Sequence, residues 1–120
     1  MIEVVNLAEK FSLFADHWRP RIVGELNGQQ IKLARLMGKF IWHQHDDADE
    51  LFLVIQGTLR MQLPDGEVQI RAGEFIIIPH GVAHLPVADA EVLVLLFEPA
   101  ETRNTGNVES DRTVADPERI

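Results

Sequence analysis

Residues 38–57 read GKFIWHQHDDADELFLVIQG and residues 73–84 read GEFIIIPHGVAH, and these two stretches decide the fold. In both, apolar and β-branched runs stop at glycine, proline or aspartate, which is typical of short β-strands joined by turns. His43 and His45 are two positions apart, so a strand would place both side chains on one face. If the polar link that follows is a tight connection, Glu50 folds back beside the histidine pair.

The same pattern continues on both sides of these stretches. Asn27–Gly28 and Pro64–Gly66 each separate two strand-like runs, and Asn-Gly in such a position is a strong hairpin signal. A further turn is expected at Asp89–Ala90. We expect strands over residues 21–26, 29–37, 41–45, 50–55, 58–63, 67–71, 74–78, 83–87 and 91–97. Short strands at spacings of about 8–12 residues predict an all-β sandwich or barrel rather than a βαβ fold.

A helix signal lies ahead of the first strand. Asn6 followed by Glu9 resembles a capping box, and Leu7, Phe11 and Phe14 form one apolar edge. A helix of about one or two turns is therefore predicted near the N-terminus.

Apolar density falls after Pro99. We expect residues 101–120 to form an irregular polar tail that lies partly on the domain surface or on a partner subunit and is frayed at its end. Residues 1–100, with the N-terminal helix and hairpin, are expected to form one domain, because 120 residues is a common size for a single domain.

The composition excludes several classes of protein. The chain has 19 acidic and 11 basic residues, a net charge of −8 and no cysteine. Without cysteine there is no disulfide framework, thiolate nucleophile or cysteine-ligated metal. Nucleic-acid binding depends on clustered Lys and Arg, so the acidic balance and the lack of a basic stripe predict no nucleic-acid partner.

Membrane insertion is also not expected. The longest apolar runs have the length of Val92–Phe97, far too short to span a bilayer. The N-terminal MIEVVNLAEK carries an early acid and no long apolar block, unlike a secretory signal. We therefore expect a soluble, cytoplasmic protein with no membrane partner.

The histidines point to a metal. Two imidazoles and a carboxylate, from His43, His45 and Glu50, suit first-row divalent metals that keep open coordination positions. His84, just after a Pro-x-Gly turn, is a candidate fourth ligand. The alternatives are a hydrogen-bonded or rim histidine and a surface glutamate. The His-x-His spacing, followed by Glu and then by Pro-x-Gly-x-x-His, favours the metal site.

Both stretches resemble the motifs of the cupin superfamily. Residues 38–57 are similar to G(X)5HXH(X)3–4E(X)6G, and residues 73–84 to G(X)5PXG(X)2H(X)3N. The first gap here has four residues instead of five, and Ala88 stands at the final Asn position. In the family that Asn is not a metal ligand, so its loss leaves the site intact. The resemblance assigns the four ligand positions to His43, His45, Glu50 and His84.

This resemblance implies a double-stranded β-helix, the cupin jelly-roll barrel, of the small single-domain cupin-2 type likened to mannose-6-phosphate isomerase. It also implies a homodimer with strands exchanged or packed between subunits, and one divalent transition metal per chain. Mn, Fe, Ni, Co and Zn all suit the ligand types. Three imidazoles and one carboxylate around an octahedral ion leave positions for water, a small-molecule ligand or dioxygen.

Three functions remain in competition. The first is a metal-dependent enzyme on a small polar molecule, either sugar isomerase- or epimerase-like or dioxygenase-like. The second is a non-catalytic protein that binds or senses a small molecule through its metal. The third is a structural dimer with an empty site, against which the complete ligand set argues. We favour the enzyme.

Other candidate residues are expected to play supporting parts. We interpret His17 as structural, His80 as exposed, and Arg35 as an outward, salt-bridged residue in preference to a substrate contact. Bulky groups near the motif strands are expected to divide between the pocket lining and an interface. They are Phe40, Trp42, Phe52, Met61, Phe75 and Phe97.

Overall fold

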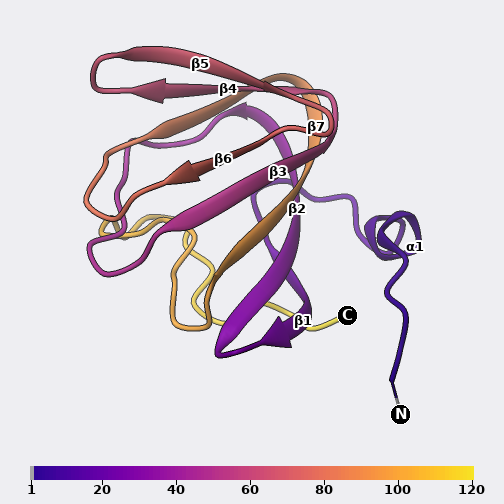
Figure 1. The fold of residues 1–120 in the computed structure, drawn as a ribbon. Coiled ribbons are helices and arrows are strands. Elements are labelled where there is room, and N and C mark those ends of the chain that lie inside the picture. Colours follow the sequence, from indigo (N-terminus) through magenta and orange to yellow (C-terminus); the bar gives the residue numbers. More distant parts are fainter. Residues whose placement is uncertain (1) are drawn as a thin grey trace.

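β-strands form nearly all of the regular structure in the computed structural model, which describes residues 2–120 (Figure 1). Within this range one short helix, α1 (Leu7–Phe11), precedes seven strands. The strands are β1 (Arg21–Leu26), β2 (Gln29–Lys39), β3 (Glu50–Gln56), β4 (Thr58–Leu63), β5 (Gly66–Arg71), β6 (Phe75–Ile78) and β7 (Leu85–Pro99). The predicted all-β class and the short N-terminal helix are confirmed.

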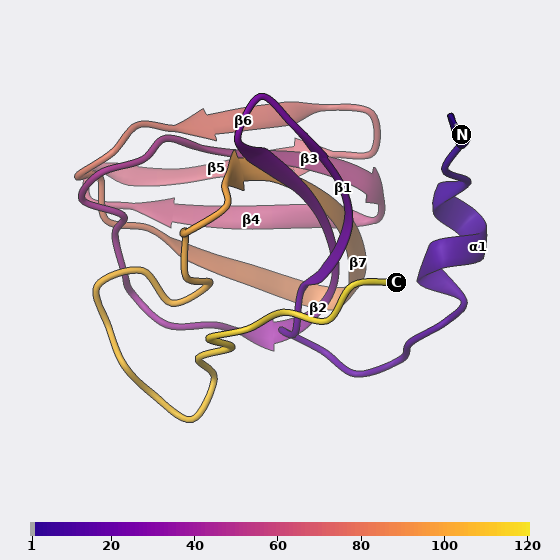
Figure 2. The same cartoon turned by 90° about the horizontal axis from the view of Figure 1, so that it is seen from below.

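Strand β7 organises the barrel. It pairs antiparallel with β2 along most of its length, with β4 near its beginning and with β3 near its end. β1 continues the sheet beyond β2, β6 beyond β3, and β5 beyond β4. Because one long strand serves partners on two sides, the sheet curls over on itself and encloses an interior, as the two orthogonal views show (Figures 1 and 2). This is the expected jelly-roll barrel.

Two hairpins form where the turn residues predicted them. Leu26 pairs directly with Gln29, so only Asn27 and Gly28 form the loop. Both have positive φ, 53° and 76°, which is the backbone of the tight turn that Asn-Gly favours. The β4–β5 hairpin also has a two-residue loop, Pro64 and Asp65, because Leu63 pairs with Gly66, but neither loop residue has positive φ.

Two segments differ from the expected strand pattern. No break occurs at Asp89–Ala90, because β7 is continuous there. Leu36 pairs with Val92 and Gly38 with Ala88, so the three β7 residues between these pairs form a bulge. Pairing with three other strands outweighs the local turn signal. The expected strand over 41–45 is instead an irregular connection after the positive-φ Gly38, and only His43 within it makes a β-bridge.

Apolar side chains fill the barrel and part of its outer surface. The interior cluster includes Leu36, Phe40, Phe52, Val54, Leu59, Met61, Leu85, Val94 and Leu96. A second cluster lies outside, where Phe11 and Phe14 pack on Leu33 and Leu93. There the Arg35 guanidinium donates to the carbonyls of Phe11 and Phe14, so it faces outward as interpreted from the sequence.

The C-terminal segment crosses the barrel and returns to β1. Its conformation is irregular, as expected, but its end is tied down. The Ile22 amide donates to the Glu118 carbonyl at 2.8 Å, and the Ile120 amide donates to the Ile22 carbonyl at 3.1 Å. Over residues 2–120, none of the helical structure has the length and apolarity needed to cross a membrane.

Candidate metal centre

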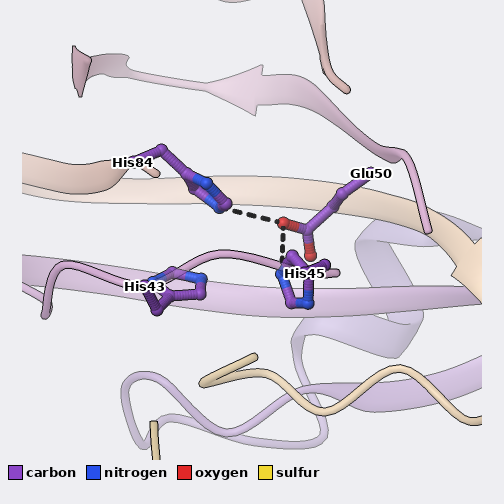
Figure 3. Close-up of side chains that lie close together, drawn as sticks. All are labelled: His43, His45, Glu50 and His84. Atoms are coloured by element: carbon purple, nitrogen blue, oxygen red, sulfur yellow. Dashed lines mark hydrogen bonds and ion pairs between the residues drawn. The ribbon is translucent and has the colours of Figure 1, made fainter. Parts of the chain in front are cut away.

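Four side chains converge inside one end of the barrel (Figure 3). His43, His45, Glu50 and His84 each offer one ligand atom, and these atoms all lie within 4.8 Å of one another. All four residues are buried, with exposed fractions between 0% and 7%. The structure thus brings together every candidate ligand singled out in the sequence.

The backbone brings the two motifs into contact at the site. His43 and His84 form an isolated antiparallel bridge, with N–O distances of 3.1 and 2.9 Å. The His45 carbonyl accepts a hydrogen bond from the Gly81 amide at 2.7 Å, which fixes the Pro-x-Gly turn against the first motif. Glu50 is the first residue of β3 and is paired with Ile78 of β6. Each candidate ligand therefore comes from a backbone segment held by its neighbours.

Hydrogen bonds fix the orientation of two imidazole rings. The Nδ1 atom of His43 lies 2.9 Å from the Ile41 carbonyl, and that of His84 lies 3.0 Å from the Val82 carbonyl. A carbonyl only accepts, so Nδ1 carries the proton in both rings and Nε2 presents a lone pair. Metal-binding histidines commonly have this arrangement.

Nε2 of His84 is the clearest sign of a missing partner. It is fully buried, makes no hydrogen bond within residues 2–120, and lies 3.3 Å from Oε1 of Glu50. The same oxygen is 3.1 Å from Nε2 of His45. A buried polar atom without a partner is costly, and a cation between these atoms would remove that cost.

The electrostatics favour the deprotonated forms that a metal requires. Burial, assisted by charge repulsion from His84, lowers the pKa of His43 to about 4. Burial by itself would raise the pKa of Glu50, but its interactions with Glu98, His45 and His84 hold that pKa well below the ordinary value. A neutral imidazole and an ionised carboxylate are ligand forms. The residues present therefore fit a divalent transition metal, and the ligand types do not select one.

A buried pair of charged residues, Lys32 and Glu98, lies beside the site and was not predicted from the sequence. Lys32 and Glu98 are 2% and 1% exposed, and Lys32 Nζ lies 3.0 Å from Glu98 Oε1. Burial and the charge of neighbouring Glu50 raise the pKa of Glu98 well above its ordinary value, although Lys32 opposes this shift. The sequence signal was a charged residue between two apolar ones, Lys32 between Ile31 and Leu33 and Glu98 between Phe97 and Pro99.

Two spaces adjoin the candidate ligands. An inner cavity of about 30 Å³, with walls that include His43 and Glu50, has room for about two water-sized molecules. Its other lining residues are apolar apart from Asn104, namely Trp18, Pro20, Ala34, Leu36, Phe40, Phe52, Pro86, Val94 and Leu96. An outer hollow of about 310 Å³ has His45 in its wall and lies between the 46–48 loop and residues 99–107.

The remaining candidates fall outside the cluster. His80 is exposed and bonds to Asp49, and His17 lies 2.8 Å from Glu91 in a partly exposed ion pair. Of the bulky residues expected to divide between the pocket lining and an interface, Phe40 and Phe52 line the inner cavity. Trp42 and Phe75 are exposed, at 46% and 61%.

The chain belongs to the cupin family. The family model described as "Cupin domain" matches residues 35–97, which contain all four candidate ligands. This confirms the resemblance drawn from the two motifs. The cluster of three histidines and one glutamate is accordingly a metal-site-like group in a cupin barrel.

Similar proteins support the same assignment. An uncharacterized protein of Bacillus subtilis (strain 168), YdbB, is 36% identical over 63 residues, which are 52% of this chain and 56% of that protein. The chain thus spans little more than half the length of this curated relative. The crystal structure of a cupin-2 domain containing protein from Shewanella frigidimarina is 45% identical, with a TM-score of 0.79 over 80% of this chain and 94% of that one. Protein NMB1881 from Neisseria meningitidis is 28% identical, with a TM-score of 0.75 over 82% and 100%.

Proposed function

We propose that this cupin is a metal-dependent enzyme acting on a small molecule. One observation carries the proposal: ligand atoms of His43, His45, Glu50 and His84 converge within 4.8 Å in a buried site. The donors are preorganised, since backbone carbonyls orient two rings and Glu50 is held ionised.

Each residue has a definable part in such a site. A divalent metal bound there supplies a Lewis acid that polarises an oxygen atom of the bound small molecule. His43 and His84 present Nε2 atoms, and Glu50 supplies the negative charge. Burial of Glu98 beside Glu50 raises its pKa, so this carboxyl group takes up a proton more readily than an exposed one. The walls of the inner cavity on this side of the centre are mostly apolar.

The cavity lining favours dioxygenase-like over sugar isomerase-like chemistry. Apart from the ligand residues His43 and Glu50, Asn104 supplies the only polar side chain among the residues that line the inner cavity. A sugar that entered this cavity would bury several hydroxyl groups without hydrogen-bond partners, at about 1–3 kcal/mol each. Dioxygen has no such requirement, and a cavity of about 30 Å³ has room for a molecule of its size.

Metal analysis followed by a turnover screen tests this function. Protein purified without a tag, chelator or added nickel is expected to contain about one divalent metal per chain. The metal-loaded protein is then assayed with catechols, keto acids and sugars. Oxygen-dependent turnover of a catechol or keto acid supports the proposal, and turnover of a sugar alone redirects it to isomerase chemistry. A protein that neither contains metal nor can be reloaded at neutral pH overturns it.

A non-catalytic binding or sensing function is the second candidate. The small volume of the inner cavity, about 30 Å³, favours it, because it leaves little room beside the candidate ligands for a reacting organic molecule. Tight, metal-dependent binding of a screened compound with no product would establish this alternative.

We also propose that the protein is a homodimer. Two cross-strand rows run over β2, β7, β3 and β6 on the outside of the barrel. We call them the outer apolar face, and they consist of Leu33, Leu95, Leu53 and Phe75, and of Ile31, Phe97, Leu51 and Ile77. None of the eight is charged, and Phe75 and Ile77 are 61% and 53% exposed. Leu33 at one end of the face is covered by Phe11 and Phe14, so the most exposed part of the face lies on β6, and exposed apolar patches often mark interfaces.

A second copy of the chain is the occupant we propose for this face. The N-terminal residues ahead of α1 extend away from the barrel (Figure 2), and Ile2 and Val4 are 100% and 96% exposed. At about 150 Å² per fully exposed large apolar side chain, Ile2, Val4, Leu13, Phe75 and Ile77 expose roughly 550 Å². A standard interface buries about 800 Å² per partner, so a two-fold dimer can cover the N-terminal residues and the outer apolar face at once.

Sedimentation of matched variants tests the dimer. At micromolar concentration the sedimentation mass of the wild-type protein is expected to be twice the 13.6 kDa of one chain. The double variant Phe75→Glu/Ile77→Glu should become monomeric. Val68→Glu, at a 40% exposed site on β5 outside the face, should remain dimeric. A wild-type mass near 13.6 kDa contradicts the dimer, and a double variant that stays dimeric places its interface elsewhere.

A further inference from the structure

The C-terminal segment is bonded to the backbone between two candidate ligands. The Asn107 amide donates to the Gln44 carbonyl at 2.9 Å, and the Gln44 amide donates to Oδ1 of Asn107 at 2.9 Å. Gln44 lies between His43 and His45 in the chain. Asn107 therefore holds both polar backbone groups of the residue that links these histidines.

Gly106 allows this close approach. A Cβ atom on Gly106 would lie 2.1 Å from the Gln44 carbonyl oxygen and 3.2 Å from Cδ2 of His43. Its φ of +55° also lies in the left-handed region. Any side chain here would push the segment away from the histidines. Its neighbour Thr105 is 0% exposed, so the segment is embedded in the molecule at this point.

The same segment contributes one residue to the wall of the inner cavity. Asn104 lines that cavity and is held by two bonds of its own segment, to the Arg112 carbonyl and from the Val114 amide, both 2.8 Å. The Arg112 guanidinium lies 5.7 and 5.6 Å from the rings of Trp18 and Phe40, which stack at 4.6 Å. Arg112 also donates to the Lys39 carbonyl. These contacts tie the segment to the wall of the cavity.

A third attachment reaches the buried ion pair. Nζ of Lys32 lies 3.2 Å from the Thr102 carbonyl as well as bonding to Glu98. Residues 102–114, which we call the C-terminal cap, are thus joined to the barrel at each end and in the middle.

We infer that the C-terminal cap is a working part of the metal centre, because it positions His43 and His45 through Gln44. Gly106 and Asn107 act as positioning residues, because they reach the ligands only through the Gln44 backbone. This inference rests on the proposed metal site. It also gives the polar C-terminal sequence a function that its composition did not indicate.

Metal release from matched glycine variants tests the cap. Gly106→Ala is compared with Gly73→Ala, since Gly73 has a φ of +84° and no atom within 4 Å of an added Cβ. Both changes strain a left-handed backbone, but only Gly106→Ala clashes with Gln44. With cobalt-loaded protein mixed with excess chelator, Gly106→Ala is expected to release metal at least about tenfold faster than wild type, whereas Gly73→Ala should match it.

Substitutions at Asn107 test the hydrogen bonds separately. Asn107→Asp keeps an acceptor for the Gln44 amide, and Asn107→Leu removes it. Hydrogen exchange of that amide in metal-free protein should be slow in wild type and Asn107→Asp and at least about tenfold faster in Asn107→Leu. Because no metal is present, this readout does not depend on the proposed metal function.

The outcomes separate the cap from the metal site. If wild type binds cobalt but Gly106→Ala releases it no faster than Gly73→Ala, the positioning function is overturned. Equal exchange of the Gln44 amide in wild type and Asn107→Leu overturns the hydrogen-bonded clamp. If wild type binds no metal, the proposed function fails and the inferred positioning of ligands fails with it, while protection of Gln44 still shows whether the clamp exists.

Discussion

The backbones of His43 and His84 are joined by two hydrogen bonds, of 3.1 and 2.9 Å, and Nδ1 of each ring has the same kind of partner. In each, Nδ1 bonds to the carbonyl two residues earlier, at Ile41 and at Val82. The two motifs therefore meet at one β-bridge and contribute equivalent imidazoles to a common centre. A metal bound there would link segments 41 residues apart in sequence, so metal binding should be coupled to the stability of the barrel.

That coupling predicts the behaviour of a histidine variant. In wild type, added zinc or manganese should raise the melting temperature. Losing a residue that only hydrogen-bonds to a metal ligand typically lowers metal affinity by about 10–100-fold. His84→Ala removes a ligand itself, so the affinity should fall by more than this. Calorimetry with and without metal measures both quantities. His80→Ala, at an exposed histidine, is the control and should behave as wild type. A full metal-induced shift in His84→Ala would exclude this histidine as a ligand.

The stability of the metal-free protein should depend on His43 below neutral pH. Its pKa is about 4 in the folded chain and about 6.5 in the unfolded chain, so the unfolded chain binds more protons between these values. Stability from this group is therefore complete above about pH 6.5 and is lost as pH falls toward 4, by at most about 3 kcal/mol.

The raised pKa of Glu98 acts in the opposite direction above about pH 4.5, because the folded chain then retains a proton that the unfolded chain loses. Urea unfolding of Glu98→Gln and of Glu98→Gln/His43→Gln, both with chelator, isolates the histidine contribution. The single variant should lose more stability than the double variant on going from pH 7 to pH 4.5. Equal losses would contradict a low pKa at His43.

The Lys32–Glu98 pair should respond asymmetrically to substitution. Glu98→Leu leaves a buried ammonium without its carboxylate and should lower the free energy of unfolding by about 3–5 kcal/mol. Lys32→Met should cost less, because burial already favours the neutral form of Glu98. The double variant Lys32→Met/Glu98→Leu should recover most of the loss, since an apolar pair of similar volume can replace a buried ion pair. Urea denaturation of the four proteins measures this cycle, and additive losses would show that the pair is not coupled.

Two motif glycines should differ in their tolerance of alanine. Gly57 and Gly73 have φ values of +89° and +84°, so each substitution strains the backbone by about 1–2 kcal/mol. Only at Gly57 would the added Cβ meet other atoms, 3.0 Å from the Glu91 carbonyl oxygen and 3.2 Å from Val92. Overpacking of this kind adds about 1–3 kcal/mol. In chemical denaturation Gly57→Ala should have a lower free energy of unfolding than Gly73→Ala. Equal values would show that β7 shifts at this point to accommodate the added Cβ atom.

Local sequence patterns were sufficient for most of the strands and for the two hairpin turns because their causes are local. The Asn27–Gly28 turn needs two residues with positive φ, and those residue types favour it wherever they occur. The turn expected at Asp89–Ala90 failed for the opposite reason. Asp89 is held by Arg60, and β7 is paired on both sides of this position, so long-range hydrogen bonds keep the strand continuous.

The sequence by itself determined the all-β class through the spacing of its turns, and its resemblance to the two cupin motifs indicated the barrel family and the four residues brought together at the site. Only the tertiary structure placed Lys32 beside Glu98, and Asn107 against Gln44, because these partners are far apart in the chain and no periodic pattern connects them. Their contacts depend on how the barrel closes and on where the C-terminal segment crosses it. Closure of this kind is a property of the whole packed chain, and no short stretch of residues encodes it.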